Sequence, residues 1–205
     1  MTVPRIGIVD YGMGNLRSMA NALEEVGARP EMVTDPATLD SYDKLVLPGV
    51  GAFGRAMANL SARGMDRALT EYARSGRPVL GVCLGMQLMA EASEESESVA
   101  GLGWVPGRVV AFQPKEGVKV PHMGWNSLQI VQDHPAIRGI EDGSDAYFVH
   151  SYHFVCADER NVVANSEHGV PFTAILAHDN LVGMQFHPEK SQAVGLTLIG
   201  NFVRD

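Results

Sequence analysis

The chain has 205 residues, of which 45% are hydrophobic and 20% charged, and its formal net charge is -8. This length supports one well-filled core, so we expect a single domain over 1–205, and the composition excludes a disordered or fibrous protein. The acidic charge and the absence of any Lys/Arg-rich run argue against nucleic acid or an anionic membrane as the partner.

The first half of the chain alternates short apolar strands with segments of helical periodicity. The predicted strands cover 5–10, 31–33, 44–47 and 78–82. The predicted helices cover 15–26, 54–60, 65–75 and 84–90, and a further helix start is expected at Asp35-Pro36. This βαβ rhythm predicts a parallel sheet with helices on both faces, in which sites lie at the carboxyl ends of strands.

The second half has a different pattern. Segment 91–100 is rich in Glu and Ser and lacks apolar periodicity, so we expect a solvated surface loop without a function. Short strands are then predicted at 105–112, 125–131, 146–150, 172–177 and 181–186. We expect them to extend the sheet in the antiparallel direction and the apolar helix 193–203 to cover the core. The predicted fold class is therefore α/β, with a central, mostly parallel sheet and an antiparallel extension.

Cys83 stands where a buried apolar strand meets a predicted helix, in the G-V-C-L-G-M-Q segment at 81–87. This arrangement is typical of a nucleophile elbow. Gly81 and Gly85 leave room for the sharp reversal, and the N–H groups at the helix start favour a thiolate. We therefore predict that Cys83 is a nucleophile. Cys156 has no such context, and we interpret it as a small buried hydrophobic residue.

The two cysteines also limit the class of protein. They are too few for a disulfide framework and are not clustered as zinc ligands are. No uninterrupted apolar stretch approaches the ~20 residues of a membrane span. We expect a cytoplasmic chain with reduced thiols, with no membrane contact and with neither a metal nor another cofactor.

A cysteine nucleophile needs a base, and His187 is the candidate. Glu189 lies two residues beyond it, which in an extended strand places both side chains on one side, so the carboxylate can orient the imidazole. The other histidines have no carboxylate placed in this way, and we assign them structural roles, with an interface role possible for two of them, His150 and His153. The full set is His122, His134, His150, His153, His168 and His178.

Attack on an amide carbonyl also requires donors for the developing oxyanion. The N–H of Leu84, which follows the nucleophile, is the first donor expected from elbow geometry. The glycine-rich loop 48–54 ends a neighbouring strand and is the expected source of a second donor. A tight strand-to-helix connection is the alternative interpretation of this loop. A phosphate cradle is disfavoured, because the Gly-Lys-Ser/Thr ending is missing.

Three motifs together resemble the class I glutamine amidotransferases. They are P-G-V-G-A-F-G at 48–54, G-V-C-L-G-M-Q at 81–87 and F-H-P-E at 186–189. The resemblance covers almost the whole chain. Within that family, segments 10–15, 121–126 and 147–152 resemble the glutaminase subunits of imidazole glycerol phosphate synthases of histidine biosynthesis.

The resemblance implies the class I glutamine amidotransferase fold and hydrolysis of glutamine to glutamate and ammonia. Cys83, His187 and Glu189 would form the catalytic triad. The Val50-Gly51 peptide would act with Leu84 as the oxyanion hole. Substrate contacts would come from Gln87 and from the backbone of Ser151, Tyr152 and His153.

The resemblance also implies a partner. Ammonia would pass to a (β/α)₈-barrel cyclase subunit in a heterodimer that makes imidazole glycerol phosphate and an aminoimidazole carboxamide ribotide. The residues expected to face this cyclase are Asn15, Trp125, Tyr147 and Lys190. Core packing is the alternative role for Trp125. The glycines around Val50 further suggest that the oxyanion peptide faces the wrong way until the partner binds its own ligand.

Three alternatives stay open. A glutaminase of the same class could serve another acceptor, as in pyridoxal phosphate or anthranilate synthesis, although segments 121–126 and 147–152 speak against this. A hydrolase could act alone on γ-glutamyl peptides, with a self-sufficient oxyanion hole. A catalytically silent subunit could only scaffold the cyclase, which the intact Cys83, His187 and Glu189 disfavour.

Overall fold

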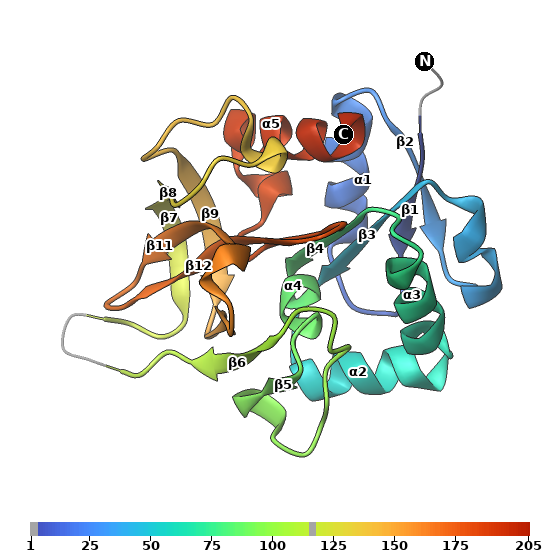
Figure 1. Cartoon of the computed structure of the whole chain (residues 1–205), viewed down its shortest axis with the longest axis horizontal. Helices are drawn as coiled ribbons and strands as arrows, with labels where there is room; N and C mark the ends of the chain where they lie inside the picture. Colours follow the sequence, from blue (N-terminus) through green and yellow to red (C-terminus); the bar gives the residue numbers. More distant parts are fainter. Residues whose placement is uncertain (1–3, 115–117) are drawn as a thin grey trace.

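An eight-stranded sheet organises the chain, in the order β2-β1-β3-β4-β13-β12-β11-β8 (Figure 1). The structure is a computed structural model that describes residues 4–114 and 118–205. Six residues of the expected domain 1–205, namely 1–3 and 115–117, lie outside these ranges. The strands are β1 (Arg5–Val9), β2 (Arg29–Val33), β3 (Lys44–Gly49), β4 (Val79–Cys83), β8 (Gln129–Ile130), β11 (Val162–Glu167), β12 (Pro171–His178) and β13 (Leu181–Met184).

The sheet is parallel from β2 to β13 and antiparallel beyond. β4 pairs in parallel with both β3 and β13, whereas β12 runs antiparallel to β13 and β11. The parallel strands β3 and β4 are buried along their whole length, which explains their continuous apolar sequences. The predicted mostly parallel sheet with an antiparallel extension is confirmed.

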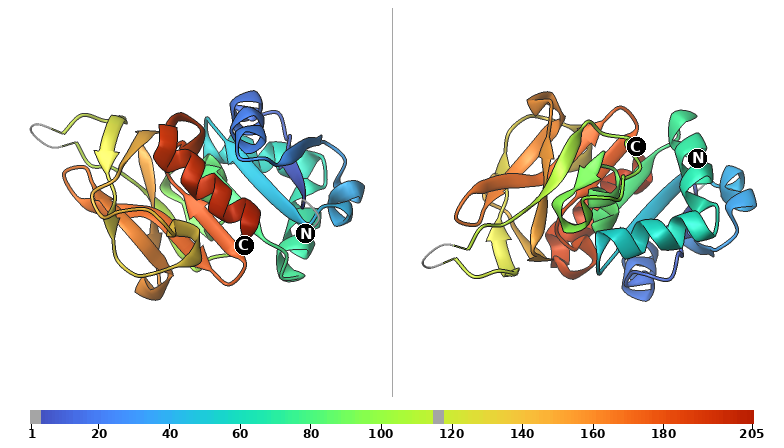
Figure 2. Two further views of the ribbon diagram at one scale, coloured as in Figure 1. Left: turned by 90° about the horizontal axis from the view of Figure 1, so that it is seen from above. Right: turned by 90° about the horizontal axis from the view of Figure 1, so that it is seen from below.

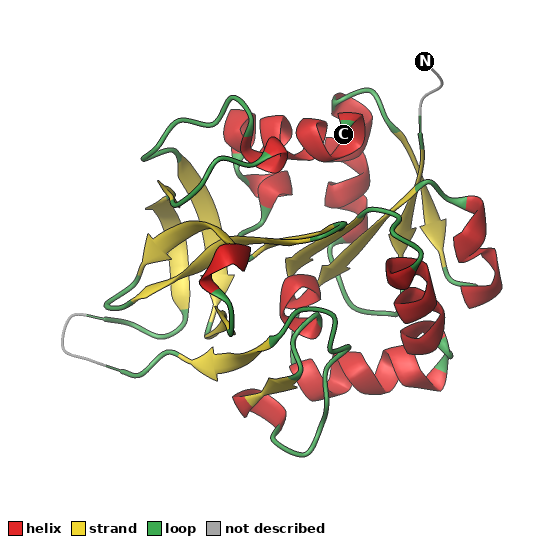
Figure 3. Cartoon of the chain, in the orientation of Figure 1, coloured by secondary structure: helices red, strands yellow, loops and turns green. Residues whose placement is uncertain are grey.

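Helices cover both faces of the parallel part, as predicted (Figure 3). One face packs against α1 (Leu16–Glu25) and α5 (Gln192–Arg204), and the other against α2 (Phe53–Ala62), α3 (Met65–Arg74) and α4 (Leu84–Leu88). The two views of Figure 2 look onto these opposite layers. None of the helices in the described ranges is long and apolar enough to cross a membrane.

Five short 3₁₀ helices lie between the larger elements in the described residues. They are η1 (Pro36–Ser41), η2 (Glu94–Ser96), η3 (Pro135–Ile137), η4 (Glu159–Asn161) and η5 (Pro188–Lys190). The helix start predicted at Asp35-Pro36 is η1, and the Asp35 carboxylate accepts a hydrogen bond from the Ala37 N–H at 2.9 Å.

Five strands of the second half form two smaller sheets. One sheet contains β5 (Ala92–Ser93), β6 (Gly107–Ala111) and β10 (Tyr152–Cys156), and the other pairs β7 (His122–Ser127) with β9 (Asp145–His150). The expectation that 105–112 and 146–150 extend the main sheet is therefore wrong, and of the predicted strand 125–131 only the part that forms β8 joins it. Apolar alternation predicts an extended backbone, but it does not specify which strand becomes the neighbour.

Segment 91–100 is not the solvated loop that its composition predicts. Ser93 is buried in β5, which pairs in parallel with β6. The Glu94 carboxylate accepts a hydrogen bond from the Ala111 N–H at 2.9 Å, and Glu95 accepts one from the Phe53 N–H at 2.8 Å. Its acidic side chains therefore bind backbone donors of other elements, which a count of charges does not reveal.

The reversal from β4 into α4 requires glycine at Gly85. A Cβ added there would overlap the carbonyl oxygen of Leu47 on β3, so the helix can approach the neighbouring strand only without a side chain. The predicted tight elbow is thus present, although α4 ends at Leu88, two residues before the predicted end.

Replacing Gly85 with alanine is expected to lower the free energy of unfolding by about 3 kcal/mol or more, because the sheet holds the Leu47 carbonyl in place. Urea unfolding measures this loss. Gly200→Ala in α5 is the matched control. Its added methyl group would meet only the flexible Arg204 guanidinium, so stability should stay equal or rise. Equal stabilities of the two variants would contradict this explanation.

Candidate active site

A cavity of about 380 Å³ opens where β3 and β4 end. Most of the residues singled out from the sequence line it: Val50, Gly51, Cys83, Leu84, Gln87, Ser151, Tyr152, His187 and Lys190. They come from four separate parts of the chain. The cavity therefore lies at the carboxyl edge of the parallel sheet, where a site is expected in an open α/β fold.

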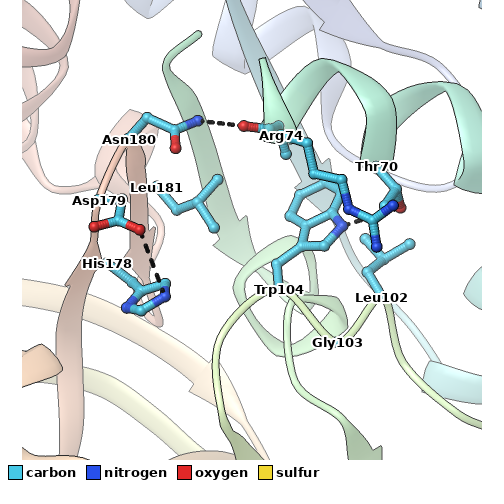
Figure 4. Close-up of a pocket in the computed structure, with 10 residues that line it drawn as sticks. Thr70, Arg74, Leu102, Gly103, Trp104, His178, Asp179, Asn180 and Leu181 are labelled. Carbon is cyan, nitrogen blue, oxygen red and sulfur yellow. Dashed lines mark hydrogen bonds and ion pairs between the residues drawn. The ribbon is translucent and has the colours of Figure 1, made fainter. Parts of the chain in front are cut away.

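A second cavity, of about 250 Å³, lies at the opposite end of β4 (Figure 4). Trp104 Nε1 donates to Thr70 Oγ1 at 3.1 Å there, and His178 lies 3.9 Å from the Asp179 carboxylate. The described residues that line it include no thiol. The first cavity is therefore the candidate active site.

Cys83 is held in the elbow conformation. Its φ of 54° lies in the left-handed region that non-glycine residues rarely adopt, so the surrounding structure must hold it there. The parallel register pairs Gly49 with Cys83, which brings the loop containing Val50 and Gly51 next to the thiol. The thiol donates to the Val149 carbonyl oxygen, with the sulfur 3.8 Å away.

His187 and Glu189 form a buried pair behind the cavity. His187 Nδ1 lies 2.9 Å from Glu189 Oε1, and the two side chains are 4% and 2% exposed. Because the carboxylate accepts, Nδ1 carries the proton, which leaves Nε2 for chemistry at the cavity. Burial lowers the pKa of His187, but hydrogen bonds to Cys83 and Glu189 outweigh it and bring the pKa to about 9.

The backbone around this pair differs from the prediction. β13 ends at Met184, so His187 lies beyond the strand, and Pro188 begins η5. The His187 N–H donates to the Tyr147 carbonyl oxygen at 2.9 Å, which ties the segment to β9. Glu189 thus reaches Nδ1 across a 3₁₀ turn and not by the alternation of a strand.

Gln87 also lines the cavity, and its side-chain amide is held by two hydrogen bonds. Its Nε2 donates to the Tyr152 carbonyl oxygen at 2.9 Å and to Gln185 Oε1 at 3.1 Å. His153 is not among the residues that line this cavity, and its ring packs on Phe112, with centroids 4.6 Å apart.

Sequence reasoning missed several residues of the site, among them Gln185 and Glu95, and it misjudged His150. Gln185 is fully buried, and its Nε2 donates to Cys83 Sγ at 3.9 Å. Glu95 lines the cavity with its carboxylate bound to the Phe53 N–H. His150, considered only for a structural or interface role, lines the cavity as well. Gln185 lies two residues before His187, whereas nothing in segment 91–100 pointed to Glu95.

Three of the four residues expected to face a partner form a continuous group beside the cavity. The Trp125 ring packs edge-on against Tyr147, with centroids 5.7 Å apart, and Lys190 Nζ lies 6.0 Å from the Tyr147 ring centroid. Trp125 is 50% exposed, so core packing does not explain it. The fourth residue, Asn15, precedes α1 and is partly exposed.

Within the described residues, no group of three or more His, Cys, Asp or Glu is arranged to hold a metal ion. A comparison with family models matches residues 7–205 to "Glutamine amidotransferase class-I". The chain belongs to this family. The prediction that the chain is an enzyme of this class is confirmed.

Relatives cover this amidotransferase almost completely. A protein from Sulfurimonas denitrificans is 48% identical over 202 residues, which is 97% of both chains. Another from Halobacterium salinarum is 49% identical over 205 residues, 97% of this chain and 92% of the relative. Both are named imidazole glycerol phosphate synthase subunit HisH. The resemblance stated from the sequence motifs is confirmed.

Solved structures agree on the fold. A PurLQS structure from Thermotoga maritima has a TM-score of 0.76 at 22% identity and covers 98% of each chain. A putative GMP synthase protein from Thermoplasma acidophilum has a TM-score of 0.74 at 20% identity, over 99% of this chain and 94% of that one. At these identities the likeness shows the fold alone.

The pH dependence of stability tests the His187 environment. Because its pKa is raised from about 6.5 to about 9, the protonated ring stabilises the fold fully below pH 6.5, and this contribution is lost as the pH rises through 9. The difference in unfolding free energy between the parent and His187→Gln should therefore narrow over that range. Urea unfolding from pH 6 to 10 measures it, and a gap that widens would contradict the assignment.

Proposed function

We propose that this amidotransferase hydrolyses glutamine with a triad of Cys83, His187 and Glu189. One observation carries the proposal. Cys83, whose backbone is strained, shares a cavity with His187, a buried histidine whose Nδ1 is hydrogen-bonded to the Glu189 carboxylate. A nucleophile, a base and an orienting group are the parts that acyl transfer through a thioester requires.

The residues divide the reaction as follows. The Cys83 thiolate attacks the carboxamide carbon of glutamine, and the new oxyanion binds the Leu84 N–H and the Val50-Gly51 peptide. His187 delivers a proton to the departing nitrogen, so ammonia leaves and a glutamyl thioester remains. His187 then takes a proton from water, whose oxygen displaces the thiolate and releases glutamate.

The cavity wall suits the amino-acid end of glutamine. Glutamine carries an α-ammonium and an α-carboxylate, and the Glu95 carboxylate offers the charge that the ammonium needs. Gln87, Ser151 and Tyr152 also line the cavity and supply polar groups. We assign these four residues to substrate binding and leave out His153, which lies outside the cavity.

We further propose that the chain is the glutaminase subunit of an imidazole glycerol phosphate synthase and passes its ammonia to a (β/α)₈-barrel cyclase in a heterodimer. The names of its relatives and the exposed group of Trp125, Tyr147 and Lys190 beside the cavity support this partner. Asn15 belongs to the same proposed surface. A cytoplasmic location fits, because the nucleophile must be a reduced thiol.

Control by the partner is a further part of the proposal. Val50 is 42% exposed and Gly51 has a φ of 106°, a conformation in which a peptide can turn over without a side-chain penalty. Met13 packs over this loop, since a Cβ on Gly51 would lie 2.8 Å from its Cε. A partner that docks at the carboxyl edge of the parallel sheet can therefore change the orientation of the Val50-Gly51 peptide through contacts with this loop.

Glutamate release from glutamine tests the function. We expect strong stimulation by a cyclase subunit with its nucleotide ligand and loss of at least ~10³-fold in Cys83→Ala, because the thioester cannot form. The melting temperature of the variant should stay close to that of the parent. Full activity without a partner would favour an independent hydrolase, and an unchanged rate in Cys83→Ala would favour a silent subunit.

A substitution at Glu95 tests the proposed orientation of the substrate. Glu95→Gln keeps the size of the side chain but removes the charge, so the KM for glutamine should rise about 10-fold while kcat changes little. Glu91→Gln is the control, since Glu91 belongs to the same segment but does not line the cavity. Steady-state glutaminase kinetics of both variants measure the effect. Equal KM values in the two variants would remove Glu95 from the site.

A further inference from the structure

A cluster of buried rings lies beside the cavity, outside the proposed triad. His122 on β7 faces His150 on β9 across the antiparallel pair, and both side chains are buried. Phe148 stacks on His122 with ring centroids 4.9 Å apart, and Phe172 contacts both histidines edge-on or tilted. One end of this cluster reaches the active site, because His150 lines the cavity.

Hydrogen bonds join these rings into a continuous chain. Asn126 Nδ2 lies 3.1 Å from His122 Nε2, and His122 Nδ1 lies 2.9 Å from His150 Nε2. His150 Nδ1 lies 2.8 Å from the Tyr152 carbonyl oxygen. Each imidazole therefore uses both of its nitrogens, and the position of one proton constrains the next.

At the outer end of this hydrogen-bond chain, Asn126 fixes which atom donates and which accepts. Asn126 Oδ1 accepts from the Ser127 N–H at 2.9 Å, and Asn126 Nδ2 donates to the Glu167 carbonyl oxygen at 2.8 Å. These two backbone partners admit only one orientation of the amide. The atom facing His122 Nε2 is thus a donor, so Nε2 carries no proton and Nδ1 does.

The inner end requires the same polarity independently. A backbone carbonyl oxygen only accepts, so the His150 nitrogen that faces Tyr152 must be Nδ1–H. His150 Nε2 is then the acceptor for the His122 Nδ1–H. Both ends agree on two neutral rings, each protonated at Nδ1. Burial lowers the pKa of His150 to about 3 and that of His122 to about 4, which keeps both rings neutral near pH 7.

The chain continues to the nucleophile. The Tyr152 carbonyl oxygen that accepts from His150 also accepts from Gln87 Nε2 at 2.9 Å. Gln87 donates in turn to Gln185 Oε1, which orients the Gln185 amide so that its Nε2 donates to Cys83 Sγ. An unbroken set of hydrogen bonds therefore connects the exposed strand β7 with the reactive sulfur.

We propose that Asn126, His122 and His150 are positioning residues of the glutaminase site, forming a neutral hydrogen-bond chain of fixed polarity. This hydrogen-bond chain holds the Tyr152 carbonyl and, through it, the side-chain amides of Gln87 and Gln185 that lead to Cys83. Its kinetic consequence rests on the proposed function, whereas its proton positions and its effect on the thiol do not.

Imidazole ¹⁵N NMR at pH 7 on the 205-residue protein tests directly which nitrogen of each ring carries the proton. We expect His122 and His150 both to carry their proton on Nδ1, the less common tautomer of a free neutral histidine. A proton on Nε2 of either ring would overturn the proposal, because one of the hydrogen bonds would then join two donors or two acceptors.

His122→Phe tests the function of the chain, since it keeps an aromatic ring in the cluster and removes both hydrogen bonds. We expect kcat/KM for glutamine to fall about 3- to 10-fold, because the two lost hydrogen bonds leave the Tyr152 carbonyl less firmly positioned. Alkylation of Cys83 by iodoacetamide, followed by peptide mass spectrometry, should slow, because the thiolate form that reacts is favoured by the hydrogen bond from Gln185, which the variant weakens.

His168→Phe is the matched control. The His168 ring stacks on His122 with centroids 4.2 Å apart, but its Nε2 bonds the Lys119 carbonyl oxygen, outside the chain. We expect both readouts to stay within about twofold of the parent, since the chain is intact. Similar losses in His122→Phe and His168→Phe would overturn the proposal, because the effect would then belong to packing.

Asn126→Ala covers the case in which His122→Phe fails to fold. It breaks the chain at its outer end and leaves every ring in place, so the same losses are expected at a smaller size, with a cooperative thermal transition retained. Unchanged kinetics and unchanged alkylation would overturn the proposal. Should the parent release no glutamate even with a cyclase subunit and its nucleotide ligand, the proposed function fails, while the NMR and alkylation results still decide the role of the hydrogen-bond chain.

Discussion

The parallel pairing of β3 with β4 places Gly49 beside Cys83, and the geometry of the site depends on that register. It positions the glycine-rich loop against the thiol, and it brings Leu47 so close to α4 that only glycine fits at Gly85. Cys83 adopts its left-handed backbone conformation at the same point. Tight packing between a strand and a short helix thus holds the proposed nucleophile in a strained backbone conformation at the cavity wall.

The pKa of His187 is raised whereas those of His122 and His150 are lowered, and the difference comes from the groups to which they are hydrogen-bonded. His187 has a carboxylate within 2.9 Å, so its cationic form is stabilised although the ring is buried. His122 and His150 have amides, a carbonyl and each other, and burial keeps them neutral. The same side chain therefore suits proton transfer in one place and rigid positioning in the other.

The second-half strands connect the cavity with the surface. β7 and β9 form a separate two-stranded sheet whose buried side carries His122 and His150 and whose accessible side carries Trp125. Alternation along a strand places Trp125 and the buried histidine ring on different sides, so one short element serves two environments. A protein that docks on Trp125 would contact the strand from which the hydrogen-bond chain starts.

The sequence by itself determined the parallel half and the elbow, and it predicted the residues of the proposed triad, because continuous apolar runs, glycines at a turn and the Phe-His-Pro-Glu segment at 186–189 are local signals. It did not determine the pairing of β6, β7 and β9, the place of Glu95, or the route from Asn126 to Cys83. Those features join residues as far as 102 positions apart, as between Gln185 and Cys83. Only the tertiary structure decided them, since polar side chains find their partners through long-range packing, which no local pattern encodes.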